Sequence, residues 1–410
     1  VLLGYVLVFF YSHTSHISWY FVNLVIMGFA SIFTVNYLCI KKNSRVIGIL
    51  FAVLSTVFFT NDLFILPSFT KTASAAIAAG GFLLIETLWT QSEKVLSASK
   101  VVSVIAAFIL MLSGSLLRFT CVYLAAPFVA LMFLLKVIQQ RKDEKLVRKV
   151  LTKAGCCLLL LFGLFLVQLI GNYINNQSPE YKNYYQYNAA RARITDTSIV
   201  EWESYEEDFK DLGLDDLDYD MLNSWSFADN DNYPVSKLNE IGKVYQSVFY
   251  NSSRPDLRII GSFLQPYFLE NPIFLSTILL LLVAIWIDRK SAGRIMLCLL
   301  GQFIMLAVFL YIGRLPYRII YGLCFALLVS ILSCISVKEI PQKGLRVALI
   351  LLTTFLVAYH VPTYIRDQSY QELPYNEYIK EADSIFTHSG EYVGSKYRYV
   401  ITAAKPYKNI

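Results

Sequence analysis

The chain has 410 residues, of which 56% are hydrophobic and 16% are charged, and its mean hydropathy is +0.50. A water-soluble domain of this length is less apolar, and several apolar runs approach the roughly 20 residues that span a bilayer as a helix. The strong two-residue alternation of an outer-membrane barrel is missing from the sequence. The composition therefore excludes a soluble globular protein and predicts an all-α polytopic membrane protein.

Eleven apolar runs predict the membrane spans, and the first of them is cut short. Their approximate limits are 1–11, 18–40, 46–60, 72–90, 101–117, 119–138, 152–174, 268–287, 295–312, 317–337 and 346–363. The segment TNDLFILPSF after the third run predicts a broken or re-entrant piece. Because Val1 opens the chain inside an apolar run without an initiator Met, we expect the natural start to lie upstream.

Basic loops predict the orientation of these spans. KKNSR (41–45), QQRKDEKLVRK (139–149), DRKSAGR (288–294) and KEIPQKGLR (338–346) are rich in Lys and Arg, and QSEKVLSASK (91–100) is weakly so. Alternating the spans places all five loops on one side of the membrane. Short basic loops normally stay in the cytoplasm, so the remaining connections are expected to face outward.

This threading divides the chain into four parts. We predict an N-terminal transmembrane bundle (1–174), an acidic extracytoplasmic domain (175–267), a second bundle (268–363) and an extracytoplasmic tail (364–410). The acidic domain has 16 Asp and Glu against 8 Lys and Arg, a net charge of −8. Its sequence predicts helices with an apolar stripe through Phe209, Leu212, Leu217, Leu222 and Trp225.

The seven cysteines lie in or beside apolar runs, so we expect no disulfides in the exported parts. This pattern favours a bacterial plasma membrane over a eukaryotic secretory compartment.

Three arginines fall on the outward side against the usual bias, namely Arg118, Arg314 and Arg318. An arginine at the membrane centre costs about 2.5–3.5 kcal/mol on insertion scales, so an anionic partner is expected to offset the cost. The guanidinium fork suits pairs of phosphate oxygens, which predicts a lipid-phosphate site. The alternative is that these arginines reach lipid headgroups or pair with a carboxylate such as Asp62, Glu86 or Glu270.

Asp62 ends the third run on the same outward side. As a functional group it could be a general base or a metal ligand, whereas the more ordinary interpretation is a helix cap or a partner for an arginine. Glu86 lies nearer the cytoplasmic end of its run and could simply reach the interface.

The densest polar cluster of the acidic domain is YYQYNAARARITDTS (184–198), which contains Tyr187, Asn188, Arg191 and Asp196. One hypothesis is that this cluster lies over the edge of the site and binds an acceptor. The more ordinary interpretation is an arginine–aspartate pair close to the membrane, with the tyrosines in an interfacial belt.

The pattern of outward Arg118, Arg314 and Arg318, a large outer insertion, and a short third span followed by NDLFILPSFTKTA resembles the GT-C class of multi-pass glycosyltransferases. The acidic domain is also similar to outer domains of uncharacterised membrane proteins from bacterial surface-polysaccharide loci. The first outer loop, YSHTSHIS, departs from that class because it has no carboxylate, and the class usually places its catalytic acid there.

The resemblance implies transfer of a sugar from a polyprenyl-phosphate donor to a cell-surface glycan or lipid acceptor at the outer face. Arg118, Arg314 and Arg318 would bind the lipid phosphate. Asp62 or, as a second choice, Asp196 would accept the proton of the acceptor or hold a divalent metal such as Mg²⁺ or Mn²⁺. Tyr187, Asn188 and Arg191 would contact the acceptor.

Two other classes stay open. A transporter or flippase of lipid-linked sugars would need ionisable residues through the membrane midplane, and the sequence shows few. A non-enzymatic anchor would display the acidic domain to a partner. All three interpretations place the chain in a lipid bilayer, and none involves nucleic acid.

Overall fold

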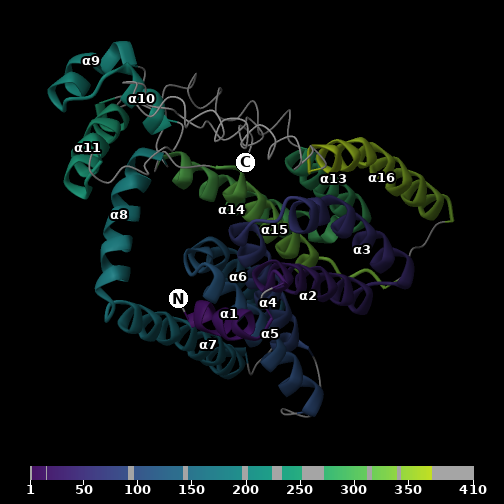
Figure 1. The fold of residues 1–410 in the computed structure, drawn as a ribbon. Coiled ribbons are helices and arrows are strands. Elements are labelled where there is room, and N and C mark those ends of the chain that lie inside the picture. Colours follow the sequence, from purple (N-terminus) through teal and green to yellow (C-terminus); the bar gives the residue numbers. More distant parts are fainter. Residues whose placement is uncertain are drawn as a thin grey trace. The chain divides into compact units, whose positions relative to one another are not determined.

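The computed structural model describes residues 2–14, 16–90, 97–141, 146–195, 202–223, 233–251, 272–311, 316–338 and 343–371. Of these described residues, 90% are helical and none forms a strand. Contacts between residues divide the chain into two compact units (Figure 1). One unit contains most of the long apolar helices, and the other contains the four shorter helices that follow α7.

The helices of the first unit correspond to the predicted spans. They are α1 (Leu2–His13), α2 (Trp19–Lys42), α3 (Arg45–Thr60), α4 (Phe69–Trp89), α5 (Ala98–Leu117), α6 (Thr120–Gln139), α7 (Leu146–Asn175), α13 (Pro272–Ile287), α14 (Ala292–Tyr311), α15 (Tyr317–Cys334) and α16 (Lys343–Gln371). Eight helices among the described residues are long and apolar enough to cross a membrane, and α1, α13 and α16 contain shorter apolar stretches. The predicted all-α polytopic membrane fold is therefore confirmed.

The segment after α3 changes its helical geometry before the chain turns back. Residues Asn61–Ile65 form one π-helical turn, and Leu66 leaves the helix with φ −115° and ψ 56°. Helix α4 begins at Phe69 after the N-cap Ser68. This is the broken piece that the sequence predicts, and it buries Asp62 at the end of α3.

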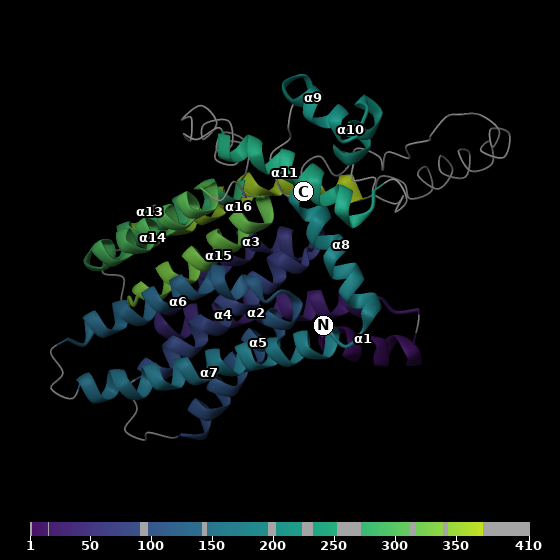
Figure 2. The same cartoon turned by 90° about the vertical axis from the view of Figure 1, so that its left-hand side faces the viewer.

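Helices α4 and α15 lie side by side in the middle of this unit (Figure 2). In each of them 83% of the most apolar stretch is buried, against 6% in α7. Small residues allow close packing around α4. A Cβ added at Gly322 of α15 would lie 2.7 Å from Ser74 Oγ of α4, and one added at Gly80 or Gly114 would lie 2.8 Å from a backbone oxygen across the contact between α4 and α5. Such small-residue contacts are typical of helix packing within a bilayer, and the exposed apolar face of α7 is suited to lipid.

The second unit contains α8 (Pro179–Thr195), α9 (Trp202–Asp211), α10 (Asp216–Asn223) and α11 (Val235–Asn251). Its core combines aliphatic side chains with the rings of Phe209, Tyr233 and Tyr245. The Trp202 ring stacks on that of Phe209, with the ring centres 5.5 Å apart and an angle of 2° between the planes. Phe209 and Leu222 of the predicted stripe are in this core, and Leu212 packs against it. The Leu217 side chain and Trp225 lie outside the described part of the chain.

A glycine ends α9 and an acidic pair begins α10. Gly213 has φ +67°, which favours glycine, and Leu214 N–H donates back to Phe209 O at 3.0 Å. Asp218 N–H donates to Asp215 Oδ1 at 2.8 Å, and Asp215 N–H donates to Asp218 Oδ2 at 3.3 Å. Two acidic side chains therefore cap the start of α10.

Candidate functional site

Three parallel helices begin at the same end of the first unit. Helix α4 begins at Phe69, α6 at Thr120 and α15 at Tyr317, and each packs against the other two. The first backbone N–H groups of a helix have no intrahelical acceptor and carry a partial positive charge. The polar side chains Asp62, Lys71, Arg118 and Tyr317 gather at these helix starts and are called the Asp62 site below.

Asp62 is held by two partners from different helices. Lys71 Nζ donates to its Oδ1 at 2.6 Å, and Tyr317 Oη donates to its Oδ2 at 2.7 Å. The Lys71 nitrogen also donates to Leu66 O at 3.1 Å and lies over the Tyr317 ring. Both charged side chains are buried, with exposed fractions of 3% for Lys71 and 7% for Asp62. An ion inside a membrane protein is tolerated when it is paired in this way.

This arrangement corrects one expectation and adds a residue that the sequence analysis missed. Among the alternatives for Asp62 was a pair with an arginine, but its cationic partner is Lys71 in the first turn of α4. The sequence analysis did not single out Lys71, which directly precedes the predicted span 72–90. The sequence could have indicated this pair, because Asp62 and Lys71 lie on either side of the predicted break.

Arg118 contacts the same first turn of α4 from the loop between α5 and α6. Its Nη1 donates to Thr70 Oγ1 at 2.7 Å, and its Nε donates to Thr120 Oγ1 at 3.1 Å. The guanidinium carbon lies 5.2 Å from the centre of the Phe69 ring. Arg118 therefore bridges the starts of α4 and α6, next to the residue that pairs with Asp62.

The other predicted site residues have different outcomes. Arg318 is in the first turn of α15, half-buried and adjacent to Tyr317. The structure thus brings Arg118, Arg318 and Asp62 to the same end of the same unit. Arg314 and Asp196 lie outside the described residues.

Tyr187, Asn188 and Arg191 are all on α8, in the second unit. Arg191 Nη2 donates to Asn188 Oδ1 at 2.8 Å, one helical turn away. Tyr187 packs against the core of the unit, and burial raises the pKa of its hydroxyl. The structure therefore gives Tyr187 a packing role and links Asn188 to Arg191.

The residues at Asp62 do not fit a divalent metal. Both carboxylate oxygens already accept hydrogen bonds, and the adjacent Lys71 ammonium would repel a second cation. Within the described ranges, no group of three or more His, Cys, Asp and Glu side chains could hold a metal ion.

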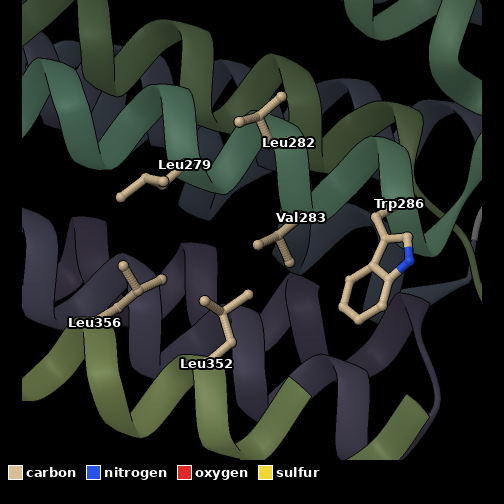
Figure 3. A pocket seen from close by; sticks show the side chains of 6 residues that line it. All are labelled: Leu279, Leu282, Val283, Trp286, Leu352 and Leu356. Atoms are coloured by element: carbon tan, nitrogen blue, oxygen red, sulfur yellow. The ribbon is translucent and has the colours of Figure 1, made fainter. Parts of the chain in front are cut away.

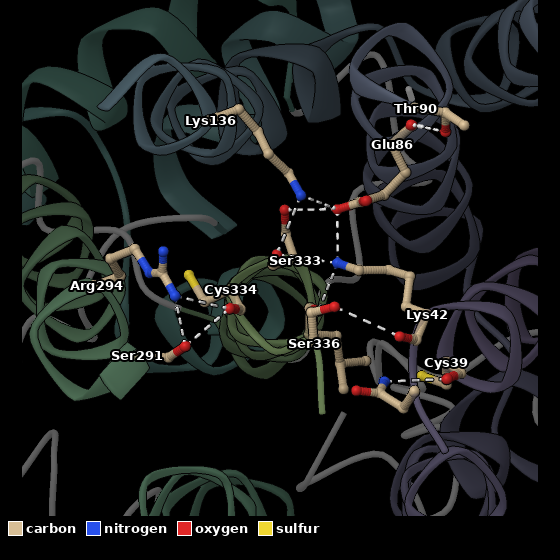
Figure 4. Close-up of polar contacts among 12 residues, drawn as sticks. Cys39, Lys42, Glu86, Thr90, Lys136, Ser291, Arg294, Ser333, Cys334 and Ser336 are labelled. Atoms are coloured by element: carbon tan, nitrogen blue, oxygen red, sulfur yellow. Dashed lines mark hydrogen bonds and ion pairs between the residues drawn. The ribbon is translucent and has the colours of Figure 1, made fainter. Parts of the chain in front are cut away.

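A second polar cluster, the Glu86 network, lies at the opposite ends of the same helices (Figure 4). Lys42 Nζ and Lys136 Nζ lie 2.7 and 2.9 Å from Glu86 Oε1, and Ser333 Oγ donates to the same oxygen at 2.9 Å. Lys42 also donates to the carbonyls of Leu332 and Ser333 at the end of α15. Glu86 does not simply reach the interface, as its sequence position suggested; it joins α2, α4, α6 and α15.

This end of the unit also contains two of the basic loops, 41–45 and 288–294. Ser44 N–H donates to Val337 O at 2.7 Å, which joins loop 41–45 to the chain that follows α15. Arg294 Nη2 donates to Ser291 Oγ at 2.6 Å, and Ser291 Oγ donates to Cys334 O at 3.0 Å. Described residues of the loops 41–45 and 288–294 therefore lie beside the end of α15 and the residues that follow it, at the end remote from the Asp62 site.

A pocket lies between α13 and α16, with a cavity volume of about 310 Å³ (Figure 3). Leucine, valine and tryptophan side chains from the two helices face one another across it: Leu279, Leu282, Val283, Trp286, Leu352 and Leu356. Its lining is apolar, in contrast to the charged Asp62 site.

Comparisons with protein-family models, with curated proteins and with solved structures found no match. The fold and the two polar ends define the class of this protein as a multi-pass α-helical membrane protein.

Proposed function

We propose that the protein is a membrane glycosyltransferase that moves a sugar from a polyprenyl-phosphate donor to a glycan or lipid acceptor, with the Asp62 site as its catalytic centre. The observation that carries this proposal is that three helix N-termini, with Arg118, Lys71 and Arg318 in or beside their first turns, lie at the same end of the unit as one buried carboxylate. Helix N-termini and guanidinium groups favour phosphate. The resemblance to GT-C enzymes in span pattern and outward arginines supports the same chemistry.

In this proposal the cationic side chains and the carboxylate have different roles in the reaction. An acceptor hydroxyl attacks the anomeric carbon of the donor, the bond from that carbon to the phosphate oxygen breaks, and its electron pair stays on the leaving phosphate. Arg118 and Lys71 stabilise the developing negative charge. The phosphate competes with Asp62 for Lys71, which releases Oδ1 to accept the proton of the acceptor hydroxyl.

The proposal includes an orientation of the protein in the membrane. If the end with Lys42, Lys136 and Arg294 faces the cytoplasm, the Asp62 site faces the outside. We place the protein in a bacterial plasma membrane, with α8–α11 on the extracytoplasmic side as an acidic domain that contacts the acceptor.

A transporter of lipid-linked sugars is the second candidate. The Lys71–Asp62 pair is a buried ion pair within the apolar helices, which is the kind of group that transport pathways use. A transporter would move the donor between leaflets without breaking the bond between sugar and phosphate.

The test is reconstitution of the complete protein in liposomes with a panel of radiolabelled polyprenyl-phosphate sugars. We expect sugar transfer that falls by about 10²-fold or more in Arg118→Met, as for other lost oxyanion contacts. Arg148→Met removes an exposed arginine at the other end of the unit and serves as the matched control, expected to retain transfer.

Asp62→Asn should abolish transfer, with a melting profile recorded in parallel to show that the protein is folded. Movement of intact donor to the other leaflet without transfer would establish the transporter. Transfer that is unchanged in both Arg118→Met and Asp62→Asn would remove the Asp62 site as the catalytic centre.

A further inference from the structure

Two buried thiols face each other where α14 meets the end of α15. Cys298 Sγ lies 3.8 Å from Cys334 Sγ, although 36 positions separate the two residues in sequence. Their side chains are buried, with exposed fractions of 0% and 4%. A disulfide joins its sulfurs at about 2.05 Å, so closure needs a combined sulfur displacement of about 1.8 Å. Small rotations about the Cα–Cβ bonds supply a movement of this size.

Other cysteines have different neighbours. Cys121 Sγ faces the carbonyl of Thr70 at 3.7 Å, and Cys324 Sγ faces the side-chain amide of Gln302 at 4.0 Å. All seven cysteines are free thiols in the structure. The Cys298–Cys334 pair is thus distinguished by a direct contact between sulfurs of two helices.

The surroundings of Cys334 are polar on one side. Its carbonyl accepts from Ser291 Oγ and from Arg294 Nη2, and Figure 4 shows both side chains pointing at it. Arg294 is half-buried and the preceding Gly293 is exposed, so the Cys334 backbone lies next to polar groups close to the surface of the unit.

We propose that Cys298 and Cys334 are a redox-sensitive thiol pair that hydrogen peroxide converts to a disulfide. In the first step one sulfur attacks the peroxide, the O–O bond breaks, an S–O bond forms and one water leaves. In the second step the other thiol attacks this sulfenic acid, the S–S bond forms, the S–O bond breaks and a second water leaves. The two thiols lose two electrons, and hydrogen peroxide is reduced to two waters.

The position of the pair gives the bond a structural consequence. Cys334 directly follows Ser333, which hydrogen-bonds Glu86 and whose carbonyl accepts from Lys42. A bond to Cys298 fixes α14 to the point where α2, α4, α6 and α15 are joined. Oxidation therefore stabilises this end of the unit against separation of its helices. The inference is independent of the proposed glycosyl transfer, because it concerns thiols at the opposite end from Asp62.

The experiment treats the folded full chain in detergent micelles with hydrogen peroxide and then alkylates the remaining thiols under denaturing conditions. We expect intact-mass analysis to show two fewer alkylated thiols than the seven of the untreated chain. Peptide mapping should find one cross-linked peptide that contains residues 298 and 334, and dithiothreitol should reverse it. The oxidised protein should melt a few degrees higher than the reduced protein.

Variants separate this pair from general oxidation. Cys298→Ser and Cys334→Ser should each abolish the cross-link and the melting shift, and Cys324→Ser on the same helix α15 should retain both. Seven alkylated thiols after treatment, a cross-link between other cysteines, or a cross-link that appears only after unfolding would overturn the proposal.

Discussion

Replacing Glu86 by glutamine tests whether the Glu86 network is held by its single negative charge. Lys42 and Lys136 both contact Glu86 Oε1, and the three charged side chains are only 11–12% exposed. Glutamine retains the size and an acceptor oxygen but removes the charge. The two ammonium groups then face each other in a largely buried position at the end of α15 without a carboxylate between them.

The magnitude follows from these distances. The contacts of 2.7 and 2.9 Å place the two lysine nitrogens at most about 5.6 Å apart, where two like charges repel by about 3 kcal/mol at an effective dielectric constant of 20. Removing one partner of a buried pair typically costs about 3–5 kcal/mol. The carbonyls of Leu332 and Ser333 still accept from Lys42, which offsets a part of this loss. We therefore expect Glu86→Gln to destabilise the protein by about 3 kcal/mol.

Thermal unfolding in detergent, followed by circular dichroism, measures this effect. Glu207→Gln changes an exposed glutamate of the second unit and is the matched control, with little expected change. Lys136→Met alone should cost less than Glu86→Gln, because Lys42 still pairs with Glu86. In the double variant, Lys136→Met should restore stability lost in Glu86→Gln, because it removes the repulsion. Additive losses in this double-mutant cycle would refute the electrostatic reasoning.

Three further predictions concern separate features. Tyr317→Phe removes a hydrogen bond to buried Asp62 and should lower the unfolding free energy by about 1.5–3 kcal/mol in denaturant titration; no loss would show that this bond is not formed. Gly114→Ala brings a Cβ to 2.8 Å from a carbonyl of α4 and should lower the unfolding free energy by about 1–3 kcal/mol. Gly155 has open space around it, so Gly155→Ala should not destabilise the protein. Equal melting points of the two variants would contradict the close contact between α4 and α5. Burial raises the pKa of the Tyr245 hydroxyl, so the contribution of this group to stability is complete below about pH 10 and declines as the pH rises further. Tyr245→Phe should weaken this decline in a pH series of melting curves. An unchanged dependence of the melting temperature on pH would argue against a buried Tyr245 hydroxyl.

Apolar length and loop charge were sufficient to predict the helices and their alternation. A helix occupies most of the described part of each of the eleven runs, because a bilayer leaves the backbone no other partners and a continuous apolar segment has essentially one structure available. Counting spans also predicted that the loops 41–45 and 288–294 lie at one end. The break near Asp62 was also visible in the sequence, in the polar pair of Asn61 and Asp62 followed by Pro67.

The partners of the charged residues were not predictable in the same way. Asp62 meets Lys71 and Tyr317, and Glu86 meets Lys42 and Lys136, through contacts between helices that are distant in sequence. These partners depend on which face of each helix turns inward, and the low hydrophobic contrast between the faces of a membrane helix does not specify that rotation.

The sequence by itself determined that this chain crosses a membrane as helices, because the cost of exposing backbone groups to lipid leaves no alternative. Only the tertiary structure decided which charges neutralise one another and that the starts of α4, α6 and α15 meet around one buried carboxylate. The physical reason is that burial of an ion depends on a partner within a few ångströms, and that distance is fixed by the packing of small residues between helices.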